Sequence, residues 1–162
     1  MHIQMIDQIK VNSPASKTWK VLAHDFGSIG DWASIITRSK PIVIDTETES
    51  GKVCGRVCKA KGFGDTEEEL THYNDSDMCF TYKAIKGLPF FIKIAENNWS
   101  VHSISENESL VKSRAEIEMS FFPGIILAPI FKLGMGKAGK RMFEELKYYI
   151  ENDKPHPRKE KQ

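Results

Sequence analysis

Apolar and polar positions alternate along much of the chain, a pattern typical of strands with one buried face. The first such stretch covers residues 3–11. Beyond Pro41 the period of two returns, interrupted at short intervals by turn-forming residues. Because the connections are short, neighbouring strands are expected to be antiparallel. The further predicted strands cover residues 42–48, 53–61, 66–73, 78–85, 93–105 and 110–121.

A helical period replaces the alternation in two regions. After the first strand, Ser13 and Pro14 predict a helix start, with Ser13 as the N-cap and Pro14 at the first helical position. Two glycines then predict a break, and a second short helix is expected through residues 33–36. A long helix follows residue 124 and ends near Asn152. Its apolar side consists of Leu127, Phe131, Met135, Ala138, Met142, Leu146 and Tyr149.

Three glycines in the long helix admit several interpretations. Gly134, Gly136 and Gly139 each cost about 1 kcal/mol relative to alanine in a helix interior. They could allow close backbone approach, a kink or space beside a ligand, or the helix could begin only after Gly136.

The order of elements predicts an α+β fold, because antiparallel strands followed by a helix pack with the helix on one side. Seven twisted strands tend to curl, so we expect a curved antiparallel sheet. The long C-terminal helix would then cover its concave face and enclose a cavity. Residues 1–152 form this domain, and residues 153–162 are expected to be a flexible basic tail.

Charge and composition argue against several classes of function. The 162 residues include 23 basic and 22 acidic side chains, so a nucleic-acid partner is not expected. The most apolar stretch, residues 121–131, is too short for stable membrane insertion. Three cysteines suit a reducing cytoplasm better than disulfides. The spacing of histidines and cysteines predicts no metal site, and no cofactor is expected.

Strand parity suggests which side chains point inward. On the last predicted strand, Ser113, Ala115 and Ile117 share the apolar face. In the middle strands Arg56 shares a face with small residues, Glu68 with Leu70 and His72, and Phe80 with Tyr82. Arg56, Glu68 and Tyr82 could therefore be the polar groups of a ligand cavity. Alternatively, Arg56 and Glu68 form a salt bridge at the rim and Tyr82 is ordinary core.

These segments, in this order, resemble the polyketide cyclase/dehydrase and lipid-transport family of the START-like superfamily. That superfamily shares its helix-grip fold with the birch-pollen allergen and the plant abscisic-acid receptors. The resemblance covers about residues 9–158. It is carried by residues 11–19, 26–32, Gly55-Arg56-Val57, Glu68-Glu69-Leu70, Phe80-Thr81-Tyr82, Gly87-Leu88-Pro89 and 145–149.

The resemblance implies a pocket between the sheet and the long helix. Arg56, Glu68 and Tyr82 would project into it, and Leu88 and Pro89 would lie on a loop at its mouth. Trp32 would lie near the entrance, with a simple packing role as the alternative. Many relatives carry Trp on the last strand where this chain has Ser113, so the pocket is expected to be wider there. The candidate ligand-binding residues are Trp32, Arg56, Glu68, Phe80, Tyr82, Leu88, Pro89, Ser113, Ile117 and Met135.

Three functions fit this pattern. The first is binding or transport of a small hydrophobic molecule, a lipid or a polyketide-like metabolite. The second is a cyclase, aromatase or dehydratase in which Glu68, with Tyr82 or His72, acts as general acid or base and Arg56 stabilises an enolate oxygen. The third is a protein-interaction module, which predicts a filled interior and a large exposed apolar patch.

Overall fold

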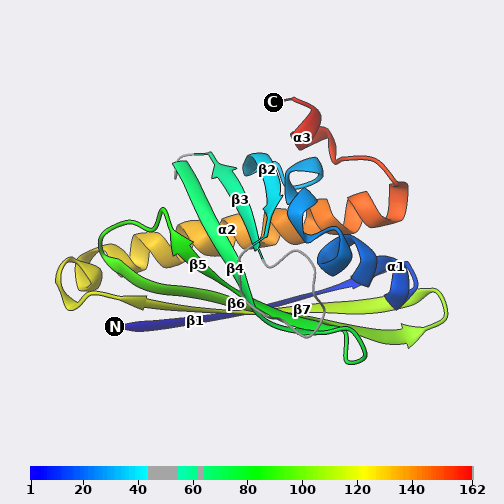
Figure 1. Cartoon of the computed structure of the whole chain (residues 1–162), viewed down its shortest axis with the longest axis horizontal. Helices are drawn as coiled ribbons and strands as arrows, with labels where there is room; N and C mark the ends of the chain where they lie inside the picture. Colours follow the sequence, from blue (N-terminus) through cyan, green and yellow to red (C-terminus); the bar gives the residue numbers. More distant parts are fainter. Residues whose placement is uncertain (44–54, 62–63, 162) are drawn as a thin grey trace.

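The structure, a computed structural model, describes residues 1–43, 55–61 and 64–161. A seven-stranded sheet curves around the long helix α2 (Phe121–Asn152), which lies along its concave side (Figure 1). Three helical segments join the first two strands: α1 (Ala15–Trp19), the π-helical turn η1 (Lys20–His24) and the 3-10 helix η2 (Phe26–Asp31). A short helix, α3 (Pro157–Glu160), follows α2. The strands are β1 (His2–Val11), β2 (Ile36–Ile42), β3 (Gly55–Ala60), β4 (Gly64–Asn74), β5 (Cys79–Lys86), β6 (Ile92–Ser105) and β7 (Glu108–Met119).

The strand order follows the chain except at one edge. From β2 to β7 each strand pairs with the next, and β1 joins the sheet beside β7. All six pairings are antiparallel. The predicted α+β class, the seven-stranded curved sheet and the covering C-terminal helix are therefore confirmed.

The second strand lies earlier in the chain than predicted. The structure begins β2 at Ile36 and ends it at Ile42, where the sequence predicts a helix through residues 33–36 and a strand over 42–48. The end of that predicted strand, residues 44–48, lies outside the described residues. Proline disfavours a strand because it lacks an N–H donor, but β2 is an edge strand, where proline is tolerated. The short-helix prediction for residues 33–36 is therefore wrong.

The helical connection also differs in detail from the prediction. Pro14, not Ser13, occupies the N-cap of α1, and no side chain caps that helix. Residues 26–31, where the glycines predict a break, form η2. There, a Cβ added to Gly27 would lie 2.7 Å from the Cβ of Pro41. Glycine thus lets η2 approach β2 closely.

The hydrophobic core has two parts, one under each half of α2. Under the C-terminal half, Phe143 stacks on Trp99 with 5.2 Å between ring centroids. Leu146 and Ile150 are almost completely buried in the same cluster. The N-terminal half covers a second cluster, whose buried members are Ile3, Ile92, Ile117, Met119 and Ala128. Residues of both clusters, among them Tyr82 and Ile117, line a hollow between the sheet and α2.

The glycines of α2 have different surroundings. The helix runs continuously through them, so a start after Gly136 is wrong. A Cβ added to Gly139 would lie 3.3 Å from a carboxylate oxygen of Asp7 on β1, whereas Gly134 and Gly136 have no heavy atom within 4 Å of such a Cβ. Despite the 32 residues of α2, no helix in the described part of the chain is apolar enough to cross a membrane.

These surroundings predict that Gly136→Ala stabilises the protein. Alanine should raise the free energy of unfolding by about 0.5–1 kcal/mol, because it restricts the unfolded chain and meets no obstacle in the helix. Gly139→Ala should gain less, since its Cβ approaches Asp7. Urea denaturation of the two variants measures both. A lower stability for Gly136→Ala would contradict the open surroundings of that position.

The C-terminal segment packs on the domain where the sequence predicts a flexible, solvated tail. Arg158 of α3 forms an ion pair with Glu144 and lies 3.5 Å from a carboxylate oxygen of Glu145. The Lys159 ammonium donates a hydrogen bond of 2.6 Å to the carbonyl oxygen of Ile36. Arg158 and Lys159 thus contact α2 and the start of β2, contacts that charge and proline content alone do not reveal.

Candidate functional site

The candidate site is built on a row of side chains that crosses the concave face of the sheet. Arg56 on β3 lies directly opposite Glu68 on β4. Tyr82 on β5 lies opposite Asn97 on β6, which lies opposite Ala115 on β7. Directly opposite residues of an antiparallel pair point to the same face. The strand register therefore brings four polar side chains together beneath α2.

Arg56 is held inside the molecule. Its side chain is 5% exposed, and its Nε donates a 2.6 Å hydrogen bond to the Glu68 carboxylate. Its Nη1 donates to the carbonyl oxygen of Phe26 at 3.0 Å. The guanidinium carbon lies 3.9 Å from the ring centroid of Phe26 and 4.9 Å from that of Tyr82. These partners compensate the cost of burying the charge. The salt bridge is thus present, in the interior rather than at the rim.

A central cavity of about 220 Å³ lies beside this row. Isoleucine, alanine and other apolar side chains form most of its wall. Its polar lining residues are Thr66, Glu68, Tyr82, Glu96 and Asn97. An apolar wall with a few polar groups is typical of small-molecule sites. The predicted site residues that line the central cavity are Glu68, Tyr82, Leu88, Pro89, Ile117 and Met135.

The connection between β5 and β6 forms part of this wall. It begins at Gly87, whose φ of 81° falls in the left-handed region that favours glycine. A Cβ at this position would lie 2.1 Å from the backbone oxygen of Asp65. Gly87 therefore lets the loop pass close to β4, and Leu88 and Pro89 follow it into the cavity wall.

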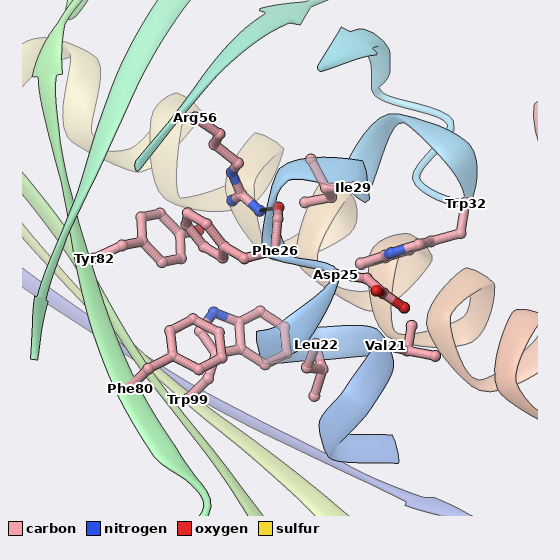
Figure 2. Close-up of a pocket in the computed structure, with 10 residues that line it drawn as sticks. All are labelled: Val21, Leu22, Asp25, Phe26, Ile29, Trp32, Arg56, Phe80, Tyr82 and Trp99. Atoms are coloured by element: carbon pink, nitrogen blue, oxygen red, sulfur yellow. Dashed lines mark hydrogen bonds between the residues drawn. The ribbon is translucent and has the colours of Figure 1, made fainter. Parts of the chain in front are cut away.

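Trp32, Arg56 and Phe80 line a different, much smaller space of about 20 Å³, together with Tyr82 (Figure 2). That volume holds about one water molecule. Trp32 and Phe80 are 4% and 2% exposed and belong to the larger core cluster. Trp32 does not line the central cavity and packs in the core, which fits the packing alternative.

Ser113 and His72 also differ from the predicted arrangement. Ser113 points inward, as parity predicts, and its hydroxyl donates a 2.8 Å hydrogen bond to Oδ1 of Asn97, but it does not line the central cavity. His72 is exposed, because a bulge between Leu70 and His72 shifts the register of β4 against β5. The inward position thus passes to Tyr73, which packs against the core.

Burial raises the pKa of two acidic groups near the site further above neutral pH. Burial, with the neighbouring Glu68 carboxylate, raises the pKa of Tyr82 to about 12. Burial likewise raises the pKa of the Cys58 thiol to about 11. Tyr82 is thus a hydrogen-bond donor rather than a base, and Cys58 is not an activated nucleophile.

Two residues of interest, Asn97 and Glu145, were not predicted from the sequence. Asn97 lines the central cavity, and the only sequence signal for it is that it alternates with Trp99 and Val101 on β6. Glu145 is 1% exposed, although glutamate on a helix usually faces solvent.

Among the described residues, no group of three or more histidines, cysteines and carboxylates is placed to hold a metal ion.

Comparison with known proteins finds a family match that covers nearly all of the domain. Residues 2–151 match the model of the family described as polyketide cyclase/dehydrase and lipid transport. No curated protein sequence matches the chain significantly. The fold is similar to that of a START superfamily protein from Mycobacterium smegmatis, with a TM-score of 0.73 and 14% identity over 93% of this chain and 98% of that one. It is also similar to a norcoclaurine synthase point mutant from Thalictrum flavum, solved with a transition-state analogue, with a TM-score of 0.67 and 13% identity over 93% and 94% of the chains.

Proposed function

The chain belongs to the polyketide cyclase/dehydrase and lipid transport family, and we propose that it binds a small hydrophobic molecule in the central cavity. The observation that carries this proposal is an apolar space of about 220 Å³ left between the sheet and α2. A mostly apolar hollow of this size, open to solvent on one side under the covering helix, is typical of a site for a small molecule. The proposed ligand-contacting residues are Glu68, Tyr82, Leu88, Pro89, Asn97, Ile117 and Met135.

The polar groups of the cavity would orient this ligand. Tyr82 keeps its proton, so it can donate a hydrogen bond to a carbonyl or hydroxyl oxygen of the ligand. Asn97 offers an amide held in place by its hydrogen bond from Ser113. Few polar groups on a large apolar wall suit a mostly apolar molecule with one or two oxygen atoms.

The geometry favours binding over the cyclase or dehydratase alternative. Glu68 accepts a 2.6 Å hydrogen bond from Arg56, which occupies the carboxylate that would serve as acid or base. Arg56 is engaged with Phe26 and Tyr82 and lines the small space rather than the central cavity. The interaction-module alternative predicts a filled interior, which the cavity argues against. Cytoplasmic location stays a prediction.

Blocking the cavity tests the proposal. Ala115 on β7 is half-buried and lines the cavity, so Ala115→Trp should fill much of the space. We expect the affinity for the neutral fluorescent probe N-phenyl-1-naphthylamine to fall at least tenfold, because the indole occupies the volume that the probe needs. Fluorescence titration measures the change.

A matched control separates cavity filling from the effect of an added tryptophan. Lys112 lies on the same strand but is exposed on the opposite face, so Lys112→Trp should leave probe affinity within twofold. Thermal melts of both variants establish that each is folded. Equal affinity in Ala115→Trp and the parent protein would exclude the central cavity as the binding site.

A further inference from the structure

A second hollow, of about 490 Å³, lies next to the central cavity and carries positive charge. We call it the cationic groove. It lies between α2, the residues just before β2 and the residue just after β3. Its floor includes half-buried Ile35 and Met142, and its exposed charged groups are basic. The lining residues that matter here are Ile35, Lys61, Lys137, Arg141, Met142 and Glu145.

The positive charge of the groove is not neutralised within the described part of the chain. Lys61, Lys137 and Arg141 form no ion pair with a described carboxylate. Arg141 is near enough to Glu144 to help lower the pKa of that carboxyl group, but Glu144 is paired with Arg158. Three cations therefore face one hollow.

The single carboxylate of the groove is already engaged. Glu145 is 1% exposed and accepts hydrogen bonds from the backbone N–H and the hydroxyl of Ser34, at 2.8 and 2.6 Å. It also lies 3.5 Å from the Arg158 guanidinium. The carboxylate of Glu145 is thus already engaged with Ser34 and Arg158. The three exposed cations of the groove remain available to an anion from solution.

The groove and the central cavity are neighbours. Ile35 lines both, and so forms part of the wall between them. Along α2, Phe131 and Met135 line the cavity, and Ala138 and Met142 line the groove on the next two turns of the same helix face. One helix face therefore leads from an apolar space to a cationic one.

The size of the cavity makes this continuity relevant. Sites for drug-sized ligands measure roughly 300–1,000 Å³, so a cavity of about 220 Å³ holds a small molecule or only part of a larger one. A ligand that extends past Ile35 would enter the groove, where an anionic end group meets Lys137 and Arg141.

We propose that the ligand is an anionic amphiphile, with its apolar part in the central cavity and one anionic group, such as a carboxylate, against Lys61, Lys137 and Arg141. This inference rests on the proposed function. Each exposed cation contributes modestly to binding, about two- to fivefold, so the groove as a whole should favour an anion by about tenfold.

Displacement of N-phenyl-1-naphthylamine by decanoate and by 1-decanol tests the inference, since the two differ in charge and share their chain length. The parent protein should bind decanoate about tenfold more tightly than decanol. The double variant Lys137→Gln/Arg141→Gln should lose most of that preference, because only Lys61 remains, with unchanged affinity for decanol. Added salt should weaken decanoate binding and spare decanol, because these cations are exposed.

The control is Lys132→Gln/Lys140→Gln, which removes the same charge from exposed positions of the same helix outside the groove. It should keep most of the decanoate preference. Equal affinity for decanoate and decanol, or an equal loss in the two double variants, would overturn the groove as the anion site while leaving the cavity proposal intact. Failure of the probe and of both amphiphiles to bind would overturn both proposals.

Discussion

Replacing Arg56 by methionine is expected to lower the free energy of unfolding by about 3–5 kcal/mol. The substitution removes the 2.6 Å hydrogen bond to Glu68, the 3.0 Å hydrogen bond to the Phe26 carbonyl and the guanidinium between two aromatic rings. The larger part of the loss comes from Glu68, whose side chain is 16% exposed and would keep its charge without a partner. Urea denaturation followed by far-UV circular dichroism measures the loss.

A double substitution tests that explanation. Arg56→Met with Glu68→Leu removes both charges, so it should be more stable than Arg56→Met alone. A loss below about 1 kcal/mol for Arg56→Met would mean that water or another cation replaces the guanidinium, and the buried ion pair would then not be what holds β3 and β4 together at the cavity. A double variant less stable than Arg56→Met would contradict the unpaired-carboxylate explanation.

Replacing Glu145 by alanine is the second large effect, with an expected loss of about 3 kcal/mol. Glu145 is 1% exposed and accepts two short hydrogen bonds from Ser34, which belongs to the connection between η2 and β2. Hydrogen bonds to a charged group contribute about 1.5–3 kcal/mol each, and relaxation of the segment recovers part of that. The measurement is the midpoint and slope of urea denaturation.

The neighbouring residue provides a matched control for this prediction. Glu144 has a side chain 55% exposed and pairs with Arg158 at the surface, so Glu144→Ala should cost below about 1 kcal/mol. Glu145→Gln, which keeps one acceptor oxygen, should fall between the two alanine variants. Similar losses for Glu144→Ala and Glu145→Ala would show that burial of Glu145 does not connect α2 to the β2 side of the sheet.

Parity predicted the inner face of β7 well, because uncharged and charged residues alternate from Val111 to Met119 and no bulge disturbs the pairing of β7 with β1. It failed at His72, because the bulge in β4 depends on how that strand pairs with β5 and leaves no mark in the local sequence. Pro41 led to a different error: the predicted strand began only after it, whereas β2 includes it. Its effect depends on whether the strand lies at an edge, which only the assembled sheet decides.

The candidate site was predictable in its chemistry and not in its shape. The inward positions of Arg56 and Tyr82 follow from strand parity, but their division between a packed space and an open cavity depends on how closely η2 approaches the sheet. Glu145 was missed because its partners come from Ser34 and Arg158, on segments on either side of it in the chain. Contacts between distant segments have no local signature.

The position of β1 at the sheet edge bears on how the chain reaches this structure. Residues 2–11 pair with residues 109–118, so the chain must be synthesised at least as far as residue 109 before the first strand finds its neighbour. Pairings of such long sequence separation slow folding, because the loop must close before the contacts form. Until then β7 presents an unpaired edge to other nascent chains. A chaperone that shields this edge, or a slow translation rate before residue 109, would therefore be expected to change the yield of native protein far more than its final stability.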